Sequence, residues 1–412
     1  MGVAMPVCLS CGGRPSLSDA EAGDGGGDVG AIPEQSAPVS APVVDVYFEN
    51  SGSMYGYVNG ATELKDIVYD YLTSLETSGA VSAIRLSYIN SKVLPAGGDI
   101  GSFVKTLTPA SLRRKGGDMG TSDLASMLGR IIAACGDTAV AVFISDCIFS
   151  PGKGVDAAAY LARQQISIRR AFAAGVRTQP RLSAVGYLCY SMFDGTYYDA
   201  GDRPSAFKGQ RPFYIWLFGA ESALRRVAGA VPAGGFFGDG VRDSVVIAGG
   251  GRELSARQYA IHPGSGHFDL SHADARHTLE HLGRDRGGKY VFAVDADFSS
   301  VFVSEAFLAD TANYHTDNAA YRVVGVKALQ EASAMFTHRV RLEATHVVPG
   351  RLTVSLRSCL PPWVWRVNDA TGDALTDSTA AMTFGIASMV RGIADGIWRD
   401  SDRQVSFTVN IK

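Results

Sequence analysis

Between residues 42 and 235, short apolar runs alternate with longer amphipathic segments. The short runs are rich in Val, Ile, Leu and Phe and are bounded by turn residues, which is typical of buried strands. The longer segments carry apolar side chains at the spacing of one helical face. We therefore expect strands at Val43–Phe48, Ile84–Ile89, Ala139–Ile144, Leu182–Met192 and Phe213–Phe218, and helices at Thr62–Leu75, Thr121–Ala134, Val155–Ala173 and Glu221–Ala228.

Strands that alternate with helices predict βαβ units and hence an α/β fold over 42–235, with a doubly wound, mostly parallel sheet. Beyond residue 235 short β-like runs lie between Gly, Pro, Asp and Asn turns, so we expect a β-rich C-terminal region over 236–412. Helices are expected there near Asp310–Asn318 and Ala380–Ala394. The expected strands of this region are Val245–Ala248, Tyr290–Val294, Val301–Val303, Phe336–Leu342, Leu352–Leu356, Trp363–Val367 and Val405–Ile411.

Residues 1–41 have no hydrophobic period and are rich in Gly, Ser and Pro. Such a stretch buries too little apolar surface to offset its ordering entropy, so we expect a flexible tether. The segment Leu9-Ser10-Cys11-Gly12-Gly13 looks like the end of a bacterial lipoprotein signal, which implies lipidation of Cys11 and a place in the cell envelope. No Lys or Arg precedes Cys11, so this interpretation requires a start upstream of Met1. The alternative is a chance match and a disordered cytoplasmic tail.

The charge balance argues against nucleic acid as a partner. The chain carries 38 Lys+Arg against 41 Asp+Glu, a net charge of −3, and it has no basic block. No uncharged apolar stretch reaches the roughly 18–20 residues of a membrane-spanning helix, so we expect membrane attachment by a lipid anchor only. The six cysteines form neither a disulfide framework nor a zinc ribbon.

The candidate chemistry lies where the first strand ends, at Glu49-Asn50-Ser51-Gly52-Ser53. Ligands of open α/β sheets bind at the carboxyl ends of strands, and oxygen donors of this kind suit Mg²⁺, Mn²⁺ or Ca²⁺. Two further loops can reach the same edge, through Thr121 and through Asp146. Each piece alone also fits a simpler interpretation, as a turn after a strand or, for Thr121, as a helix cap. We interpret Asp45 as a strand-start residue.

Together these residues resemble the von Willebrand factor A domain and its metal-ion-dependent adhesion site. The resemblance covers about 42–220 and implies that Ser51 and Ser53 are the two serines of the Asp-x-Ser-x-Ser turn. It further implies that Thr121 is the threonine of the second loop and Asp146 the aspartate of the third. Glu49 departs from the family, which has aspartate there, and its extra methylene moves a bound cation outward or requires a bridging water.

Two other features of the sequence are candidate sites. His277-Thr278-Leu279-Glu280-His281 matches the inverted zinc-peptidase motif, in which a helix would present both imidazoles to zinc and the glutamate would act as base. A solvated helical turn is the simpler interpretation. Tyrosines and phenylalanines flank the predicted ligand edge, and they suit either partner binding or packing on the first helix: Tyr55, Tyr57, Phe193, Tyr197 and Tyr198.

We therefore expect a non-enzymatic binding or scaffold protein of the bacterial cell envelope, with a cytoplasmic location as the alternative. The resemblance implies that a protein partner supplies an acidic residue to a divalent cation held by Glu49, Ser51, Ser53, Thr121 and Asp146. The competing hypothesis is an envelope zinc metalloenzyme that uses His277, Glu280 and His281.

Overall fold

The computed structural model describes residues 40–117, 123–236, 240–329, 335–398 and 401–412. From Ser40 onward they belong to one compact unit. The expected tether and Cys11 fall in 1–39 and lie outside the described residues, so lipidation stays a prediction. Among the helices that the structure describes, none is long and apolar enough to serve as a membrane span.

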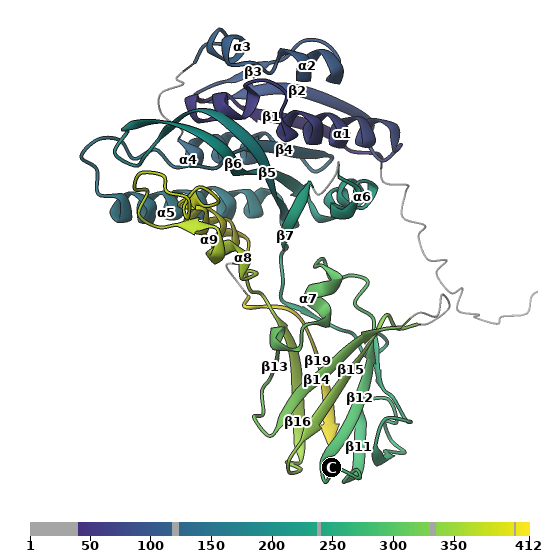
Figure 1. Ribbon diagram of the computed structural model, residues 1–412. Coiled ribbons are helices and arrows are strands. Elements are labelled where there is room, and N and C mark those ends of the chain that lie inside the picture. Colours follow the sequence, from purple (N-terminus) through teal and green to yellow (C-terminus); the bar gives the residue numbers. More distant parts are fainter. Residues whose placement is uncertain (1–39, 118–122, 237–239, 330–334, 399–400) are drawn as a thin grey trace, which may run out of the picture. The chain divides into compact units, whose positions relative to one another are not determined.

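The expected α/β layer is present, and its strands lie side by side in the order β3-β2-β1-β4-β6-β5-β7 (Figure 1). β1 pairs in parallel with β2 on one side and with β4 on the other, as βαβ units require. The strands are β1 (Val43–Glu49), β2 (Ala83–Ile89), β3 (Val93–Pro95), β4 (Ala139–Ser145), β5 (Leu182–Tyr198), β6 (Pro204–Ala220) and β7 (Val241–Ile247).

The part of this sheet formed by β6, β5 and β7 is antiparallel, whereas the sequence predicted successive parallel βαβ units. β5 and β6 are both 17 residues long and form a hairpin, so β6 lies between β4 and β5 and runs against both. The connection is a short turn in which Asp199 Oδ1 accepts from the N–H groups of Gly201 and Arg203, both at 2.9 Å. Strands joined by so short a turn can only pair antiparallel. The sheet is therefore mixed, with parallel strands near its centre.

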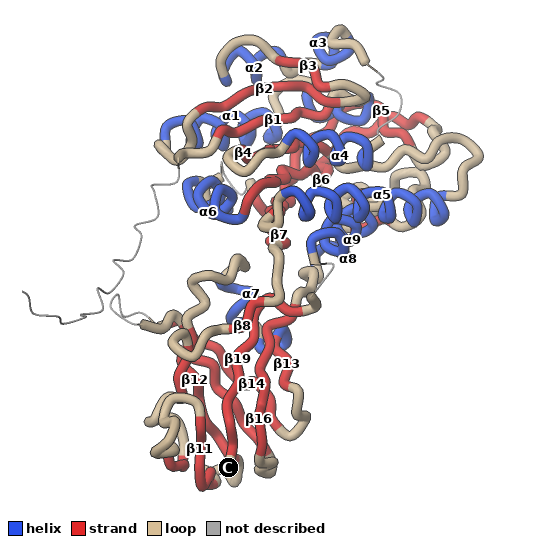
Figure 2. Tube along the Cα trace, turned by 180° about the vertical axis from the view of Figure 1, so that it is seen from behind, coloured by secondary structure: helices blue, strands red, loops and turns tan. Residues whose placement is uncertain are grey.

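Helices cover both faces of the sheet, because the central strands are apolar on both sides. Val44 and Val46 of β1 face a core shared with α1, α2, α3 and α6, whereas Tyr47 faces a core shared with α4, α5 and α9. Helices α5 and α9 lie side by side (Figure 2). The helices of the described residues in this part are η1 (Gly52–Val58), α1 (Glu63–Thr77), α2 (Ile100–Thr106), α3 (Pro109–Arg113), α4 (Leu124–Ala134), α5 (Ala157–Thr178), α6 (Glu221–Ala230), η2 (Ala233–Gly235), α8 (Trp363–Arg366) and α9 (Ile386–Ile397).

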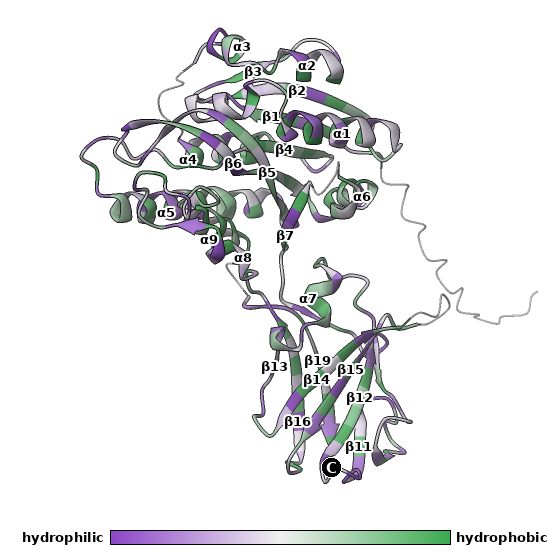
Figure 3. Ribbon diagram, in the orientation of Figure 1, coloured by the Kyte–Doolittle hydropathy of each residue, from purple (hydrophilic) through white to green (hydrophobic). Residues whose placement is uncertain are grey.

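The C-terminal half contains the expected β-rich part, built as two packed sheets. One has the order β10-β11-β19-β16-β13 with β8 beside β19, and the other the order β14-β15-β12-β9. Hydrophobic and hydrophilic positions alternate along these strands, with the buried ones forming a separate core (Figure 3). The elements are β8 (Arg252–Glu253), β9 (Tyr259–Ile261), β10 (His267–Leu270), β11 (Thr278–Gly283), β12 (Tyr290–Ala296), α7 (Glu305–Ala309), η3 (Thr311–Asn313), β13 (Tyr314–Thr316), β14 (Tyr321–Ala328), β15 (His338–Ala344), β16 (Gly350–Arg357) and β19 (Arg403–Ile411).

The packing does not follow the expected boundary at 235/236. β7 completes the first sheet, and the segment from α8 to α9 packs into the core beside α5. α9 approaches α5 closely because it presents glycine there: a Cβ on Gly392 would lie 2.9 Å from Gln165 O. Between α8 and α9 lies the short parallel pair β17 (Asn368–Asp369) and β18 (Thr383–Phe384).

Three local predictions in this half were wrong. Trp363–Val367, expected as a strand, contains helix α8, since Pro362 supplies a helical backbone angle just before it and Trp363 is buried in the core. Val301–Val303 is a loop, and the range Asp310–Asn318, expected to hold a helix, contains only the short 3₁₀ turn η3, with helix α7 just before it.

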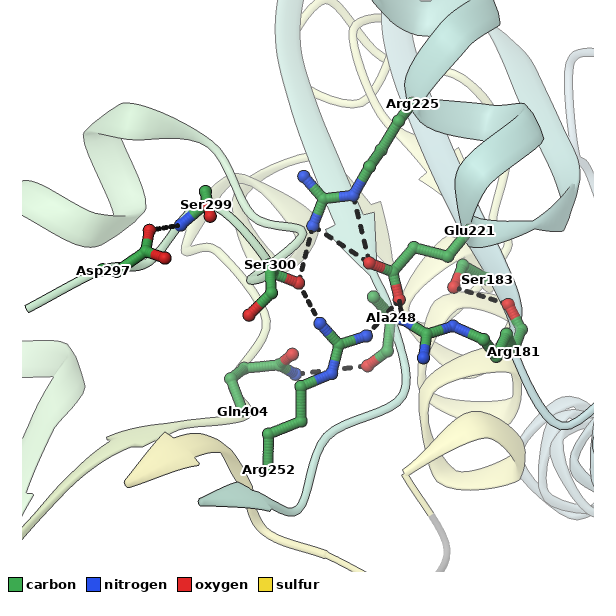
Figure 4. A network of polar contacts seen from close by, with 10 residues as sticks. All are labelled: Arg181, Ser183, Glu221, Arg225, Ala248, Arg252, Asp297, Ser299, Ser300 and Gln404. Atoms are coloured by element: carbon green, nitrogen blue, oxygen red, sulfur yellow. Dashed lines mark hydrogen bonds and ion pairs between the residues drawn. The ribbon is translucent and has the colours of Figure 1, made fainter. Parts of the chain in front are cut away.

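An ionic network holds α6 in place (Figure 4). The Glu221 carboxylate, with 5% of its side chain exposed, accepts from Arg225 on the same helix and from Arg181 and Arg252. Arg225 and Arg252 both donate onward to the carbonyl oxygen of Ser300. One buried carboxylate therefore serves three guanidinium groups.

Candidate functional site

The expected carboxylates do meet at one edge of the sheet. Glu49 is the last residue of β1, and Asp146 directly follows β4, which pairs with β1 in parallel up to Phe48 and Ile144. Parallel neighbours place their carboxyl ends together. Both carboxylates are fully buried, with no exposed surface on either residue.

The loop after β4 is held by its own hydrogen bonds. Ser145 Oγ donates to Glu49 Oε2 and accepts from the N–H of Cys147 at 2.7 Å. Asp146 Oδ1 accepts from the N–H of Ile148 at 3.3 Å, whereas Asp146 Oδ2 is buried with no hydrogen-bond partner. Cys147 adopts a left-handed backbone with φ of 54°, which costs free energy in a residue with a Cβ. The loop that presents Asp146 is thus strained and incompletely satisfied.

The electrostatics of Asp146 reflect its position. Burial, and then the negative charge of Glu49, raise the pKa of the Asp146 carboxyl to about 7, against smaller opposing effects of Ser53, the Ile148 N–H and Arg211. Two buried carboxylates that close together cannot both be ionised at low cost. Either a proton or a cation has to lie between them.

Hydroxyl and amide groups complete the oxygen-rich edge. Ser51 Oγ and Ser53 Oγ lie 2.9 Å apart, and Ser51 is buried. Both side-chain atoms of the fully buried Asn50 lack a hydrogen-bond partner. Thr121, the remaining expected ligand, lies outside the described residues. The structure therefore brings together four of the five expected metal-site residues, Glu49, Ser51, Ser53 and Asp146, and does not describe the fifth.

This donor set fits a hard cation better than a soft one. Within the described ranges, no cluster of three or more His, Cys, Asp or Glu side chains offers a metal site. The strand-end site has two carboxylates and otherwise neutral oxygens, the chemistry that suits Mg²⁺, Mn²⁺ or Ca²⁺. The unpartnered Asp146 Oδ2 is an observation that a bound cation would explain.

Sequence reasoning missed three residues at this edge. Ser145 fixes the Glu49 carboxylate, and its position one residue before Asp146 was the available signal. Asn90, after β2, is buried and donates to Gly116 O at 2.9 Å, which ties the next loop to the site. Arg211 lies on β6, near enough for its charge to lower the pKa of Asp146. Nothing in the sequence pointed to Arg211, because the hairpin that carries it was not expected.

The aromatic residues near this edge are mainly structural. Tyr57 is fully buried, contacts Phe193 edge-on at 5.1 Å between ring centroids, and donates to Pro212 O at 2.6 Å. It packs on the β5–β6 hairpin and shares its core with α1. Tyr198 is 41% exposed. Asp45 forms an ion pair with Arg85 on β2, consistent with a role at the strand start.

The histidine cluster does not form the expected helical turn. Residues 278–283 are strand β11, and His281 has a left-handed φ of 52°. His277 Nδ1 contacts Asp274 Oδ1 at 3.0 Å and its Nε2 contacts Ala256 O at 2.9 Å, while Glu280 pairs with Lys412. Both ring nitrogens of His277 and the Glu280 carboxylate are thus engaged in structural contacts.

Comparison of the chain with protein-family models, with curated proteins and with solved structures found no match.

Proposed function

We propose that this protein is a non-enzymatic binding protein that engages a protein partner through a divalent cation at the strand-end site. Glu49 and Asp146 would hold the cation, directly or through water, with Ser51 and Ser53 as neutral ligands and Thr121 as the expected fifth. An acidic residue of the partner would complete the shell. A location in the cell envelope, with Cys11 as the lipid anchor, belongs to the same proposal.

The observation that carries the proposal is the fully buried Asp146 carboxylate beside Glu49, because its Oδ2 lies buried without a well-formed hydrogen bond. Burial disfavours the ionised form of both carboxylates, and the Ser53 side chain and the charge of Arg211 offset this only in part at Asp146. The large majority of buried polar side-chain atoms have at least one hydrogen-bond partner. A divalent cation would supply the missing charge and the missing contact together.

The zinc metalloenzyme hypothesis depends on histidine ligands that the described residues do not bring together. Asp146 and Glu49 are buried and carry no histidine beside them among the described residues, and His277 is engaged elsewhere. No specific observation therefore favours the zinc metalloenzyme hypothesis.

A metal-dependent capture experiment tests the proposal. Immobilised wild-type protein should retain a partner from extracts of its native host in the presence of Mg²⁺ and release it with EDTA. Asp146→Ala should retain nothing in either condition. Asp45→Ala removes a carboxylate from β1, the strand that ends at Glu49, away from the site, and is the matched control. Equal retention with EDTA, or by Asp146→Ala, would contradict the proposal.

A further inference from the structure

The strand-end site is closed in the structure, so a partner's acidic group requires something to move. Glu49 and Asp146 have no exposed surface and Ser51 has 3%. Among the described segments that contact the 145–149 loop, residues 372–385 stand apart. They belong to neither large sheet and come from the stretch between α8 and α9. We call residues 372–385 the strap.

The strap contacts the site loop and the strands beside it. Phe384 O accepts from the N–H of Phe149, three residues after Asp146, at 3.5 Å. Thr383 Oγ1 accepts from the hydroxyl of Tyr214, which pairs across the sheet with Ser145, at 3.0 Å. On β5, Tyr190 donates to Ala381 O at 3.2 Å. The strap is therefore attached to the strands that end at the site.

The ends of the strap are anchored, since Thr383 and Phe384 are buried, whereas its middle is weakly attached. The hydrogen bonds of Tyr190 and of the Phe149 N–H are long, and most strap residues between 373 and 382 are exposed or half-buried. Segments with few buried contacts open at lower free energy than the whole fold. The β17–β18 pair closes the strap on itself, and Gly372 and Gly385, at its two ends, both have left-handed backbones with φ of 66° and 80°. The exposed part of the strap, residues 373–382, can therefore open while its ends act as hinges.

Arg211 gives independent evidence that the closed position is not fully satisfied. Its guanidinium is 1% exposed, stacks on Tyr197 at 4.7 Å, and has no ion pair within the described residues. Among the described residues it donates to Ala380 O and Met382 O of the strap, at 3.3 and 3.4 Å, and hydrogen-bonds the Tyr57 side chain, while its Nε has no hydrogen-bond partner. A buried cation with such contacts is costly, and that cost lowers the stability of the closed strap.

We propose that the strap gates the strand-end site, with Arg211, Tyr190 and Tyr214 as the residues that hold it closed. Lifting the strap releases the 145–149 loop and exposes Arg211 beside the site, where its guanidinium favours an acidic partner group. The gating role rests on the proposed metal site, whereas the opening of the strap does not.

The chain contains its own probe for opening and its own control. Cys147 lies in the site loop and Cys189 in the middle of β5, and both are fully buried. Cys189 is in the opposite core from the strap. N-ethylmaleimide should therefore modify Cys147 when the strap opens and Cys189 only on global unfolding. Mass spectrometry of peptides reports both rates from one sample.

In EDTA, the double variant Tyr190→Phe, Tyr214→Phe removes two strap hydrogen bonds and should speed modification of Cys147 by roughly 10-fold or more. Cys189 should keep its wild-type rate. Thr383→Val removes one of the bonds from the strap side, with a smaller acceleration, and serves if the double variant does not fold. An unchanged rate of Cys147 modification, or equal acceleration at both cysteines, would contradict the proposal that the strap opens.

A second arm separates the two proposals. Mg²⁺ should slow Cys147 modification in the wild type, because a cation on Asp146 fixes the loop, and should have no effect in Asp146→Ala. If the strap variants speed the modification of Cys147 in EDTA while Mg²⁺ does not change its rate, the opening of the strap is supported and the metal site is contradicted. If Mg²⁺ slows Cys147 modification in the wild type while the strap variants keep the wild-type rate, the gating proposal is contradicted and the metal site is supported.

Discussion

Replacing Asp146 by Asn tests the charge balance of the site without removing its shape. In the metal-free wild type, burial and Glu49 raise the pKa of Asp146 from 3.8 to about 7. The folded protein therefore binds the Asp146 proton more tightly than the unfolded chain does. The associated stability is fully present below about pH 3.8 and is lost as the pH rises through about 7.

The size of the effect follows from that shift. A change of about three pKa units corresponds to roughly 4 kcal/mol of differential stability between the two ends of this range. Asparagine carries no proton to lose, and its oxygen can keep the hydrogen bond from the Ile148 N–H while its amide group donates towards Glu49. We expect Asp146→Asn to be a few kcal/mol more stable than wild type at pH 8 in EDTA, with the difference shrinking towards pH 4.

Urea unfolding in EDTA from pH 4 to pH 8.5, monitored by circular dichroism, measures the difference. Asp99→Asn is the control, because the Ser102 N–H lowers the pKa of that exposed carboxyl and any effect should have the opposite sign and be small. Parallel pH profiles for wild type and Asp146→Asn would refute the claim that Asp146 ionises at a cost.

Three further changes have defined outcomes. Glu49→Asp introduces the shorter side chain found in the family that the sequence resembles. Calorimetric titration should show tighter Mg²⁺ binding than in wild type. Weaker binding would mean that the hydrogen bond from Ser145 to Glu49 matters more than the length of the Glu49 side chain. Glu221→Gln should lower the free energy of unfolding by about 2–3 kcal/mol, because it leaves three guanidinium groups without a counter-charge. The control Arg181→Lys, at a 64% exposed position, should lower it by under about 1 kcal/mol. Equal losses in urea unfolding would contradict the stabilising role of the network. Gly392→Ala should lower the free energy of unfolding by about 1–3 kcal/mol, because the added Cβ would meet Gln165 O and Ile168. An increased free energy of unfolding would show that α9 does not pack closely on α5.

The sequence predicted the first half of the site better than the fold around it. Val43–Phe48 and Ala139–Ile144 are apolar on both faces, and such runs are recognisable as central parallel strands, so the residues after them were placed correctly. Glu49 and Asp146 therefore met at one edge as expected. Thr121 remains a prediction, and the helix that follows it is capped by Asp123, which accepts from the Ser126 N–H at 3.1 Å.

The hairpin and the strap were missed for a physical reason. Antiparallel and parallel buried strands have the same hydrophobic content, so Phe213–Phe218 gave no sign of its direction. The return of α9 to the first core depends on a contact between Gly392 and residues more than 200 positions earlier, which no local pattern contains. Arg211 and the strap, which depend on both features, could not be anticipated.

The central claim is that Asp146 and Glu49 hold a divalent cation, and differential scanning calorimetry with Mg²⁺ tests it most directly. At a hundredfold excess over the dissociation constant, a cation bound only by the folded state stabilises it by about 2.7 kcal/mol. We predict a matching rise in melting temperature for the wild type in millimolar Mg²⁺ or Mn²⁺ and no rise for Asp146→Ala. An unchanged melting temperature of the wild type with Mg²⁺, Mn²⁺ and Ca²⁺ would contradict the account.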